Sequence, residues 1–571
     1  MSEPLGTAFR PQGRMRLGQT FFMLWVVALA LFSGQWSVPV TDRDEARYSQ
    51  AATQMMETGD YIDIRFQDQP RYVKPAGIYW MQVATSQVFG GQEAPIGAYR
   101  LPSFIGILIA SLITGMIGAR IAGGPAGALA GGLLGLGLLA GVEGRIAKTD
   151  AMLLASGTLA QLGLFMVLVQ PKGSPKQSFW PWPFLFWFAS GLAVLIKGPI
   201  VTMVSASTII GYLIVTRDWR AISRLRSLMG IIVFAAVGLS WVALITVQTD
   251  GAFVRESVGH ALLGKVAEGD DAHGGVPGYH TALLPAMFWP GTALLFLAGT
   301  VAWIRRREPA VIFLLSWFVP TWIIFEAVAT KLPHYVLPAY PALAILAAIG
   351  VRDVKELLAH RAVRWGHRLA LLLFVIITIA LGALPYLAAR EMGAELYQPQ
   401  HYSVSVAAAL ALIVGLVIFR KPTVSKMAFG SIFVIAYYAV TYEAALPNLD
   451  RMFPAQRITA VASRLEGCGD DIRFATAGYR EPSNIFYLGT ETLLTDGEGA
   501  ALFLLENPKC GVAVVDRREA EAFNATIGTI PLREVATIEA YNVSKGRDLT
   551  MTMVVREESA LHLGEGAFRR L

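Results

Sequence analysis

Charged residues are scarce in this sequence of 571 residues: they make up 16% of it, whereas 54% of the residues are apolar. Soluble globular domains carry about 25% charged residues. Several apolar runs of roughly 18 residues or more are long enough to cross a bilayer. The scarcity of charge argues against an ordinary soluble protein, and the runs predict a polytopic α-helical membrane protein. We attribute the formal net charge of +6 to loops that fix orientation, not to nucleic-acid binding.

Nucleotide-binding motifs are absent and cysteine is rare. The chain has no G-x-x-x-x-G-K-[ST] loop, so ATP-driven transport has no support, and no dinucleotide glycine fingerprint follows a strand. Its two cysteines, Cys468 and Cys510, lie in no metal-ligand pattern. Each precedes a predicted strand, so in an oxidising compartment they could join neighbouring strand ends. Two free thiols are the alternative.

The apolar runs predict about thirteen transmembrane helices in the first 446 residues. The first run follows a basic, polar segment and has no small-residue cleavage site, so we interpret it as a retained span and not as a signal peptide. The predicted spans are 18–36, 100–119, 123–142, 150–170, 180–197, 199–216, 228–248, 281–303, 309–328, 334–350, 369–388, 404–419 and 427–445.

Positive charge predicts the orientation of these spans. With the N-terminus in the cytoplasm, the clusters of Arg and Lys at 217–226, 305–307, 352–368 and 420–426 all fall in short cytoplasmic loops. The segment 76–91 is too short to cross comfortably at ~1.5 Å per residue, and counting it as a span would place these clusters outside. We therefore expect 76–91 to be a helix lying at the interface.

The composition changes near Pro447 and predicts a soluble α/β domain. The segments 471–479 and 511–516 are typical of buried strands, 499–507 and 517–528 of helices, and 533–558 of a hairpin with its turn near Lys545. We therefore predict a transmembrane domain at 1–446, with external loops at 37–99 and 249–280. A periplasmic α/β domain is predicted at 447–571.

Ionisable residues that this topology does not explain gather on the external side. Such residues are costly at membrane depth and usually line a cavity or face partners, although any one alone could be a solvated loop charge. Cations near the bilayer surface suit a phosphate headgroup, and a neighbouring carboxylate suits a general base. Together they predict transfer of a group from a lipid phosphate to a hydroxyl. The external residues include Asp42, Asp44, Glu45, Lys74, Glu143, Arg145, Lys148, Asp150, Lys197, Glu256, His260, Lys265, His273, Tyr279, His280, Glu326, Lys331, His334 and Tyr335.

Six motifs in a fixed order resemble the membrane glycosyltransferases of the GT-C type. They are DRDEARY (42–48), KP (74–75), KTDAML (148–153), IKGP (196–199), HGGVPGY (273–279) and KLPHYVLPAYP (331–341). The bacterial branch that includes the aminoarabinose transferases acting on lipid A and relatives of the protein O-mannosyltransferases is the most similar. GYREPSNIFYLGT (478–490) extends the resemblance weakly into the C-terminal domain.

The resemblance implies a set of roles. Such enzymes pass a sugar, with inversion, from a polyprenyl-phosphate carrier on the external face to an acceptor. The catalytic acid/base position matches Asp44, with Glu45 beside it, and the second-loop aspartate matches Asp150. The remaining candidates are Lys74, Lys331, Tyr335 and Arg71 for the donor phosphate, and Tyr72, His273, Tyr279, His334 and Lys197 for the substrate.

One departure bears on the donor. Aminoarabinose transferases usually carry EKPP around the lysine, whereas this chain has YVKPAG (72–77). Because a carboxylate would suit an amino sugar, a neutral hexose or a uronic acid fits at least as well. The acceptor alternatives are lipid A, a lipopolysaccharide core sugar, another envelope glycan or a protein hydroxyl, the last as in a protein O-mannosyltransferase.

We expect no required cofactor, with a divalent ion near Asp44 and Glu45 as an alternative. The expected partners are a polyprenyl-phosphate-linked sugar donor, a lipid or glycan acceptor and the membrane, but no nucleic acid. The expected location is the bacterial inner membrane. A lipid-linked sugar transporter or flippase is the main competing function, although no paired halves are visible. A receptor or scaffold would not require the external carboxylates and lysines.

Overall fold

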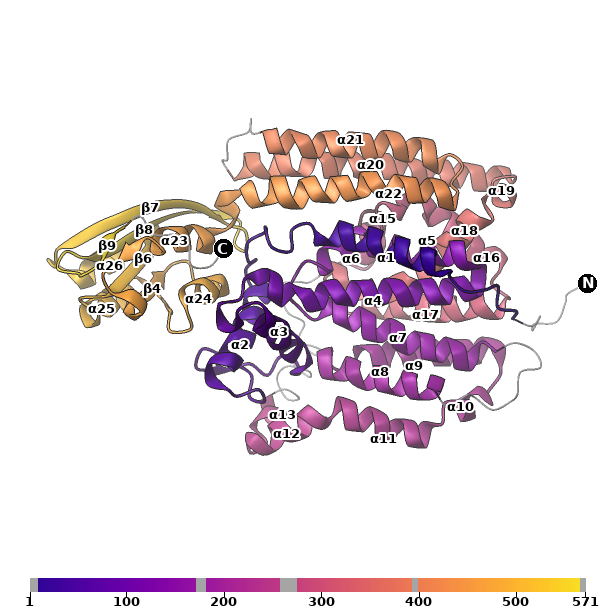
Figure 1. Ribbon diagram of the computed structural model, residues 1–571, viewed down its shortest axis with the longest axis horizontal. Helices are drawn as coiled ribbons and strands as arrows, with labels where there is room; N and C mark the ends of the chain where they lie inside the picture. Colours follow the sequence, from indigo (N-terminus) through magenta and orange to yellow (C-terminus); the bar gives the residue numbers. More distant parts are fainter. Residues whose placement is uncertain (1–8, 171–180, 257–274, 393–398, 565–571) are drawn as a thin grey trace, which may run out of the picture.

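Apolar helices that run side by side form the larger part of the molecule, and a small domain built around a sheet lies at one end of them (Figure 1). The computed structural model describes residues 9–170, 181–256, 275–392 and 399–564. Seven described helical segments are long and apolar enough to cross a membrane, and two bent helix pairs pass the same test. The chain is therefore a multi-pass membrane protein; the number of crossings stays a prediction.

The bounds of these elements follow the apolar runs of the sequence closely. The long segments are Ile96–Ala122 (α4), Asp150–Leu168 (α7), Pro309–Ala327 (α17), Pro333–Arg352 (η5, Pro333–Ala339, with α18, Tyr340–Arg352), Arg361–Glu391 (α20), Tyr402–Phe419 (in α21, Pro399–Phe419) and Val424–Asn448 (α22, Val424–Ala439, with the turns after it). The bent pairs are Ser227–Gly238 (α11) with Ser240–Gln248 (α12), and Tyr279–Met287 (α15) with Gly291–Ile304 (η4 and α16, Leu295–Ile304). Shorter apolar helices are Leu17–Phe32 (α1), Gly124–Leu136 (α5), Pro181–Lys197 (α8) and Ile200–Thr216 (α9).

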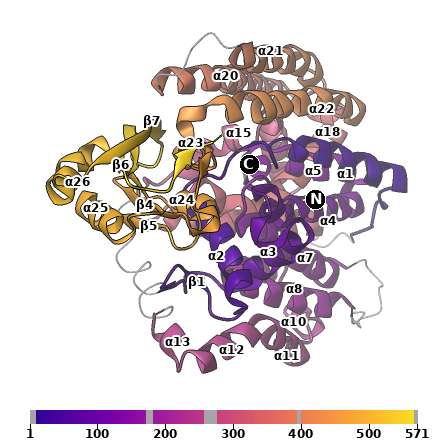
Figure 2. The ribbon, with the colours of Figure 1, turned by 60° about the vertical axis from the view of Figure 1, so that its left-hand side comes forward.

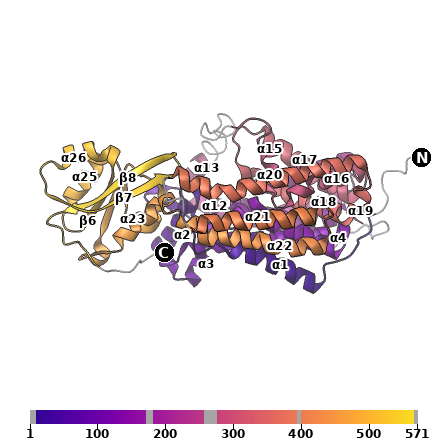
Figure 3. The same cartoon turned by 90° about the horizontal axis from the view of Figure 1, so that it is seen from above.

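Small residues let neighbouring helices pack closely in this layer. A Cβ atom added at Gly127 of α5 would lie 2.5 Å from the carbonyl oxygen of Gly115 in α4 and 2.6 Å from Cβ of Ala119. Close backbone approach of this kind is how membrane helices associate without a hydrophobic driving force. At one edge of the layer, α20, α21 and α22 lie side by side (Figures 1 and 3).

The connection between α1 and α4 folds into two short helices and a small hairpin. These elements are Asp44–Thr58 (α2), Arg65–Phe66 (β1), Gln69–Pro70 (β2) and Gly77–Val88 (α3). They lie at the end of the helices that carries the sheet domain, which we call the domain end (Figure 1). α3 occupies the predicted interfacial segment 76–91 and packs against α2 and α4.

Basic connections gather at the opposite end of the helices. α10 (Ala221–Arg224), within the Arg-rich segment 217–226, and α19 (Val354–Leu357), within 352–368, both lie there, far from the sheet domain (Figure 1). Short helices at the domain end include α6 (Leu138–Glu143) and α13 (Ala252–Glu256).

The C-terminal domain is built on a five-stranded sheet with strand order β5-β4-β6-β8-β7. β4 is parallel to β5 and β6, whereas β8 is antiparallel to β6 and pairs with β7 as a hairpin. The elements are α23 (Pro454–Ala462), β3 (Leu465–Glu466), β4 (Arg473–Ala477), α24 (Pro482–Leu488), β5 (Leu493–Thr495), α25 (Gly497–Glu506), β6 (Gly511–Asp516), α26 (Ala520–Ile527), β7 (Leu532–Asn542), β8 (Arg547–Arg556) and β9 (His562–Leu563). The predicted α/β character of this segment is confirmed.

Helices cover both faces of the sheet, which explains the unbroken apolar sequence of β6. Val512 and Val514 pack in the cluster that contains Ile458 of α23. Ala513 and Val515 alternate with them and pack with Leu504 of α25 in a second cluster. A strand buried on both faces is expected to be apolar throughout.

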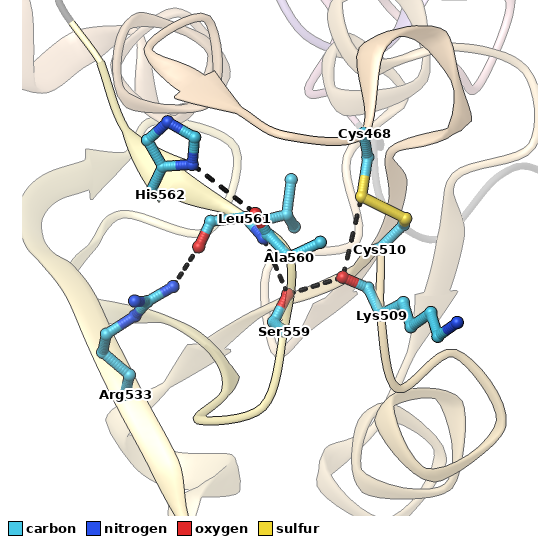
Figure 4. Close-up of a disulfide and its surroundings, with 8 residues drawn as sticks. All are labelled: Cys468, Lys509, Cys510, Arg533, Ser559, Ala560, Leu561 and His562. Carbon is cyan, nitrogen blue, oxygen red and sulfur yellow. Dashed lines mark hydrogen bonds between the residues drawn. A yellow bond between two sulfur atoms is a disulfide. The ribbon is translucent and has the colours of Figure 1, made fainter.

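Cys468 and Cys510 form a disulfide with a Cα–Cα distance of 5.9 Å (Figure 4). Cys510 immediately precedes β6, and its carbonyl oxygen accepts a hydrogen bond from the amide of Arg473, the first residue of β4. The bridge therefore ties neighbouring strand ends, and of the two alternatives left open by the sequence the structure contains the disulfide.

Candidate active site

Asp44 is the first residue of α2 and is exposed at the domain end. Its carboxylate makes no recorded hydrogen bond or ion pair within the part of the chain that the structure describes. The start of a helix favours negative charge, because unsatisfied amides and the helix dipole point there. Asp44 is therefore an accessible carboxylate that is free to accept a proton or to contact a ligand, as far as the described residues show.

Glu45, the next residue, is in the opposite situation. It is 1% exposed, and its two oxygens accept hydrogen bonds from Nε and Nη2 of Arg100 at 2.7 and 2.9 Å. The amides of Thr41 and Ala147 donate to it as well, both at 2.9 Å. Burial alone would raise the pKa of Glu45, but Arg100 and these amides hold it below its ordinary value. The geometry gives Glu45 the role of an anchor between α2, α4 and the segment before α7.

Five ionisable side chains meet where α6, α7, α8 and η5 converge at the domain end. We call Glu143, Lys148, Asp150, Lys197 and His334 the charge cluster. Lys197 Nζ lies 2.6 Å from Asp150, and Lys148 Nζ lies 3.0 Å from Glu143 and 3.8 Å from Asp150. The ring nitrogens of His334 lie 3.7 Å from Glu143 and 3.8 Å from Asp150.

Burial shapes the electrostatics of this cluster. It raises the pKa of Glu143 to about 7, against the opposing attraction of Lys148. Burial would lower the pKa of Lys148, but Glu143 and Asp150 outweigh it and raise that pKa above its ordinary value. Lys148 is therefore fixed as a cation, whereas Glu143 can change its charge near neutral pH.

Asp44 belongs to the same site as the charge cluster. Its negative charge acts on Lys148 and on His334. It also acts on Arg71, whose Nε donates to the hydroxyl of Tyr79 at 3.2 Å and whose guanidinium lies 5.3 Å from the ring centre of Tyr48. A potential proton acceptor thus acts on an arginine and on one buried lysine of the charge cluster.

The segment around Lys74 adjoins this site. Tyr72 is buried; its hydroxyl donates to Asp63 at 3.0 Å and its ring packs edge-on against Phe253 at 5.5 Å. Lys74 is half-buried in the turn just before α3, three residues after Arg71. The structure therefore brings the segment 71–74 close to Asp44 through Arg71.

The candidates near residue 335 divide into two groups. His334 is in the charge cluster, and the ring of Tyr335 packs against it at 5.2 Å. Lys331 is buried and donates to the carbonyl of Val328, with no ion pair recorded for it among the described residues. Its predicted phosphate contact stays a prediction.

The external loop contributes less to the described site. Tyr279 is half-buried and packs edge-on against His280 at 5.2 Å. His280 in turn lies 3.1 Å from the carbonyl of Leu332. His273 lies outside the described residues.

The sequence singled out Glu143 and Lys148 as unusual, but not as members of the site. Lys148 lies two residues and Glu143 seven residues before Asp150, and this closeness in the sequence was the available signal. Tyr48, the last residue of the motif DRDEARY, and Tyr79 were not named as site residues, because a buried tyrosine beside an arginine has no signature in a single sequence. Arg100 was also missed, although an arginine at the start of an apolar run marks a polar partner inside.

The residues present do not fit the divalent ion considered at Asp44 and Glu45. Both oxygens of Glu45 already accept from Arg100, and Asp44 is exposed whereas Glu45 is buried. Among the described residues, no group of three or more His, Cys, Asp or Glu side chains is arranged to hold a metal.

Comparisons with known proteins agree with this geometry. The family model described as dolichyl-phosphate-mannose-protein mannosyltransferase matches residues 33–249. An undecaprenyl phosphate-α-4-amino-4-deoxy-L-arabinose arabinosyl transferase of Pseudomonas paraeruginosa is 26% identical over 398 residues, 68% of this chain and 69% of that protein. ArnT from Cupriavidus metallidurans has a similar fold, with a TM-score of 0.72 at 20% identity over 94% of this chain and 97% of that one. Its structure bound to undecaprenyl phosphate gives a TM-score of 0.73 at 19% identity, over 94% and 98%.

The chain is a membrane glycosyltransferase that is similar to those of the GT-C type. The family match contains seven of the predicted site residues of this glycosyltransferase: Asp44, Glu45, Arg71, Tyr72, Lys74, Asp150 and Lys197. Those near residue 335 lie beyond the match.

Proposed function

We propose that this glycosyltransferase moves a sugar from a polyprenyl-phosphate carrier to a hydroxyl group of an envelope acceptor, at the domain end of its helices. One observation carries the proposal: the carboxylate of Asp44 is exposed, has no recorded partner among the described residues, and acts electrostatically on the buried Lys148 and on Arg71. A proton acceptor beside fixed cations is what displacement of a lipid phosphate by a hydroxyl requires.

The reaction then follows in one displacement. Asp44 takes the proton of the acceptor hydroxyl while the oxygen of that hydroxyl forms a bond to the anomeric carbon of the sugar. The bond between that carbon and the phosphate oxygen breaks, and its electron pair stays on the phosphate. The carbon is inverted because attack comes from the face opposite the leaving group. The free carrier phosphate carries more negative charge than the donor. Cations at the site therefore stabilise the charge that develops on the leaving phosphate in the transition state.

We assign phosphate binding to Lys74 and Arg71, together with Lys331 and Tyr335. Lys197 and His334 would orient the donor from the charge cluster, and Tyr72 and Tyr279 the sugar or the acceptor; His273 is kept as a candidate from its motif. Asp150 would act by holding Lys197, 2.6 Å away, and not as the proton acceptor. Glu45 would act by anchoring the helix that carries Asp44.

We propose undecaprenyl phosphate as the carrier, since a similar fold binds it and a relative is named for an undecaprenyl phosphate-linked aminoarabinose. The sugar itself is a separate question, because YVKPAG lacks the acid that precedes the lysine in EKPP. A neutral hexose, a uronic acid and aminoarabinose are the alternatives. Lipid A, a core sugar, another glycan and a protein hydroxyl are the acceptor alternatives.

We also propose that the protein lies in a bacterial inner membrane with its N-terminus in the cytoplasm and residues 447–571 as a periplasmic domain after a transmembrane domain at 1–446. Two observations support this orientation. Arg-rich segments lie at the end away from the C-terminal domain, as the positive-inside rule expects of cytoplasmic loops. The disulfide lies in the C-terminal domain, as expected for an oxidising compartment.

Two experiments test the proposal. Mass spectrometry of envelope lipids and glycans from a deletion strain should show one missing sugar, which names the donor and the acceptor. The full-length protein in nanodiscs is then given a donor panel: undecaprenyl phosphate carrying 4-amino-4-deoxy-L-arabinose, glucose, galacturonic acid or mannose, with lipid A or a Ser/Thr peptide as acceptor. Release of undecaprenyl phosphate that depends on an acceptor is the expected result. An unchanged envelope together with no release from any donor would reject the proposal.

A further inference from the structure

The C-terminal domain binds the turn that leads into α2. Four of its residues act on positions 40–43, immediately before Asp44: Ser483 hydrogen-bonds to Asp42, and three others make the contacts that follow. The hydroxyl of Tyr479 donates to Asp42 at 2.7 Å, the amide of Val40 donates to the hydroxyl of Tyr487 at 3.0 Å, and Nη2 of Arg43 donates to the carbonyl of Ser544 at 3.1 Å. We call these three contacts the latch; Figure 2 shows α24, which carries Tyr487, beside α2.

The latched turn is strained. Arg43 has φ 66° and ψ −106°, in a region that L-residues other than glycine rarely adopt. A residue stays in such a conformation only when its surroundings hold it there, and such residues concentrate at functional sites. Arg43 is the N-cap of α2, so its conformation sets the direction in which Asp44 leaves the turn.

The turn is held from the opposite side as well. Thr41 donates to Glu45 through both its amide and its hydroxyl, at 2.9 Å each, and Glu45 is paired with Arg100 of α4. The helical layer therefore fixes one side of the turn, and the C-terminal domain fixes the other.

Other contacts between the C-terminal domain and this region lie further along the chain. The hydroxyl of Thr490 accepts from Gln50 at 2.6 Å and donates to Glu57 at 2.7 Å. Gln67 donates to the carbonyls of Thr490 and Thr492, both at 2.8 Å. These contacts dock the domain on the body of α2 without touching the strained turn.

We propose that Tyr479 is a positioning residue, through which the C-terminal domain holds the strained turn 40–43 and so aims Asp44 at the charge cluster. Tyr479 does not touch the reacting atoms; it acts on Asp42, two residues before Asp44. The inference rests on the proposed function, because it takes Asp44 to be the proton acceptor.

The chain offers a matched pair of variants. Tyr479→Phe removes a hydroxyl that contacts Asp42 and Ser483 but keeps the buried ring. Thr490→Val removes a hydroxyl that also contacts two side chains, yet lies away from the turn. If the domain only needs to be docked, both variants should behave alike.

Hydrogen exchange tests the latch without a donor. In full-length protein in nanodiscs, Tyr479→Phe should make the amides of residues 41–47 exchange about tenfold faster, the change expected when a hydrogen bond to a charged group is lost. Thr490→Val should leave that segment unchanged. Equal exchange of this segment in wild type and Tyr479→Phe would overturn the proposal whether or not the protein transfers sugar.

Kinetics test the link to Asp44. With the panel donor that wild type turns over, Tyr479→Phe should lower kcat about tenfold or more at unchanged donor KM, because small misplacements of a reacting group are costly. Thr490→Val should stay within about twofold, because it leaves the contacts of the turn 40–43 intact and distant sites act independently. A wild-type kcat in Tyr479→Phe, or equal losses in both variants, would reject the inference while leaving the glycosyltransferase activity established.

A second substitution adds a measurement, recovery of kcat, that simple destabilisation of the protein would not produce. Glycine adopts positive φ without steric cost, so Arg43→Gly removes the strain at this position. It also removes the contact of Arg43 with Ser544, so Arg43→Ala, which loses that contact but keeps the strain, is its control. The double variant Tyr479→Phe/Arg43→Gly should therefore recover at least a few-fold of the kcat lost in Tyr479→Phe alone. A double variant slower than Tyr479→Phe would show that strain at Arg43 is not what the latch holds.

Discussion

Two carboxylate-bearing segments meet at the domain end, and they use their carboxylates differently. In the segment 143–150, Glu143 and Asp150 are both buried and both paired with lysine. In the turn 40–45, Glu45 is equally buried and paired with arginine, but Asp44 is exposed with no recorded partner in the described chain. Asp42, the fifth acid, accepts a hydrogen bond from Tyr479. The other four acids therefore divide into three that hold cations and one that is open to a substrate.

The difference shows that the partner, and not the residue type, decides what an acid can do. Removing one member of a buried ion pair costs about 3–5 kcal/mol because the other charge is left uncompensated. Glu45, whose pKa is held below its ordinary value by Arg100 despite burial, therefore gives up its charge only with loss of structure. Asp44 has no such partner among the described residues, so replacing it leaves no buried cation uncompensated.

The largest effect should come from Asp44→Asn. The amide keeps the shape of the side chain but cannot accept the proton of the acceptor, so kcat should fall by about 10²–10⁴-fold, the usual contribution of a positioned general base. Donor KM and the melting temperature should change little. The measurement is acceptor-dependent release of undecaprenyl phosphate by full-length protein in nanodiscs.

The control for this variant is Asp68→Asn, an exposed acid in the same connection. It should keep the wild-type rate, because it lies beyond α2 and outside the charge cluster. Near-normal turnover in Asp44→Asn would assign the proton acceptor to another acid of the site.

Glu45→Gln should have a large effect of a different kind. Leaving Arg100 without its carboxylate should lower the free energy of unfolding by about 3–5 kcal/mol, which thermal unfolding followed by tryptophan fluorescence would detect. The remaining folded protein should turn over within a few-fold of wild type. A stable but inactive Glu45→Gln protein would remove the distinction between the two neighbouring acids.

Lys74→Ala should raise donor KM by about tenfold or more, the loss expected for one charge-assisted hydrogen bond to phosphate. Its kcat at saturating donor should change less, since the base is intact. Lys545→Ala, at the exposed hairpin turn, is the matched control for loss of a positive charge. Equal KM values in wild type and Lys74→Ala would place the phosphate away from the segment 71–74.

The contrast between the two segments was only partly visible in the sequence. Helices and strands follow from apolar periodicity, and even the pairing of Cys468 with Cys510 could be considered because each cysteine precedes a strand. Asp44 and Asp150 could be picked from ordered motifs. The sequence could not show which acid is paired, because the partners come from elsewhere in the chain: Arg100 for Glu45, and Lys197 for Asp150.

The role of the C-terminal domain was hidden for the same reason. The motif 478–490 suggested a link to the membrane portion, but the contact of Tyr479 with Asp42 joins residues 437 positions apart. A single sequence contains local propensity and motif order, and it contains no record of such distant pairs. The strained backbone at Arg43 is equally invisible, because nothing in the sequence marks a positive φ at arginine.

The smallest effect should come from Glu143, the paired acid whose pKa burial raises to about 7. Below that pH Glu143 is neutral, and the two lysines of the cluster face Asp150 alone; above it Glu143 is anionic and the lysines are balanced. A sugar phosphodiester keeps one negative charge throughout, so donor KM should rise as pH rises through 7. One unit charge at roughly 10 Å and an effective dielectric of about 20 is worth about 1.7 kcal/mol before screening, so the rise should be a few-fold.

Glu143→Gln removes this titration and holds the cluster in its more cationic form. Donor KM should then stay at its low-pH value from about pH 6 to about pH 8, while the exposed control Glu498→Gln should follow wild type. The direction in which donor KM changes distinguishes two roles of Glu143. If Glu143 helped to bind the donor, its loss would raise KM at every pH; if its charge opposes the phosphate, its loss lowers KM only above neutrality. A pH-independent KM in wild type would mean that the phosphate binds beyond the reach of this carboxylate.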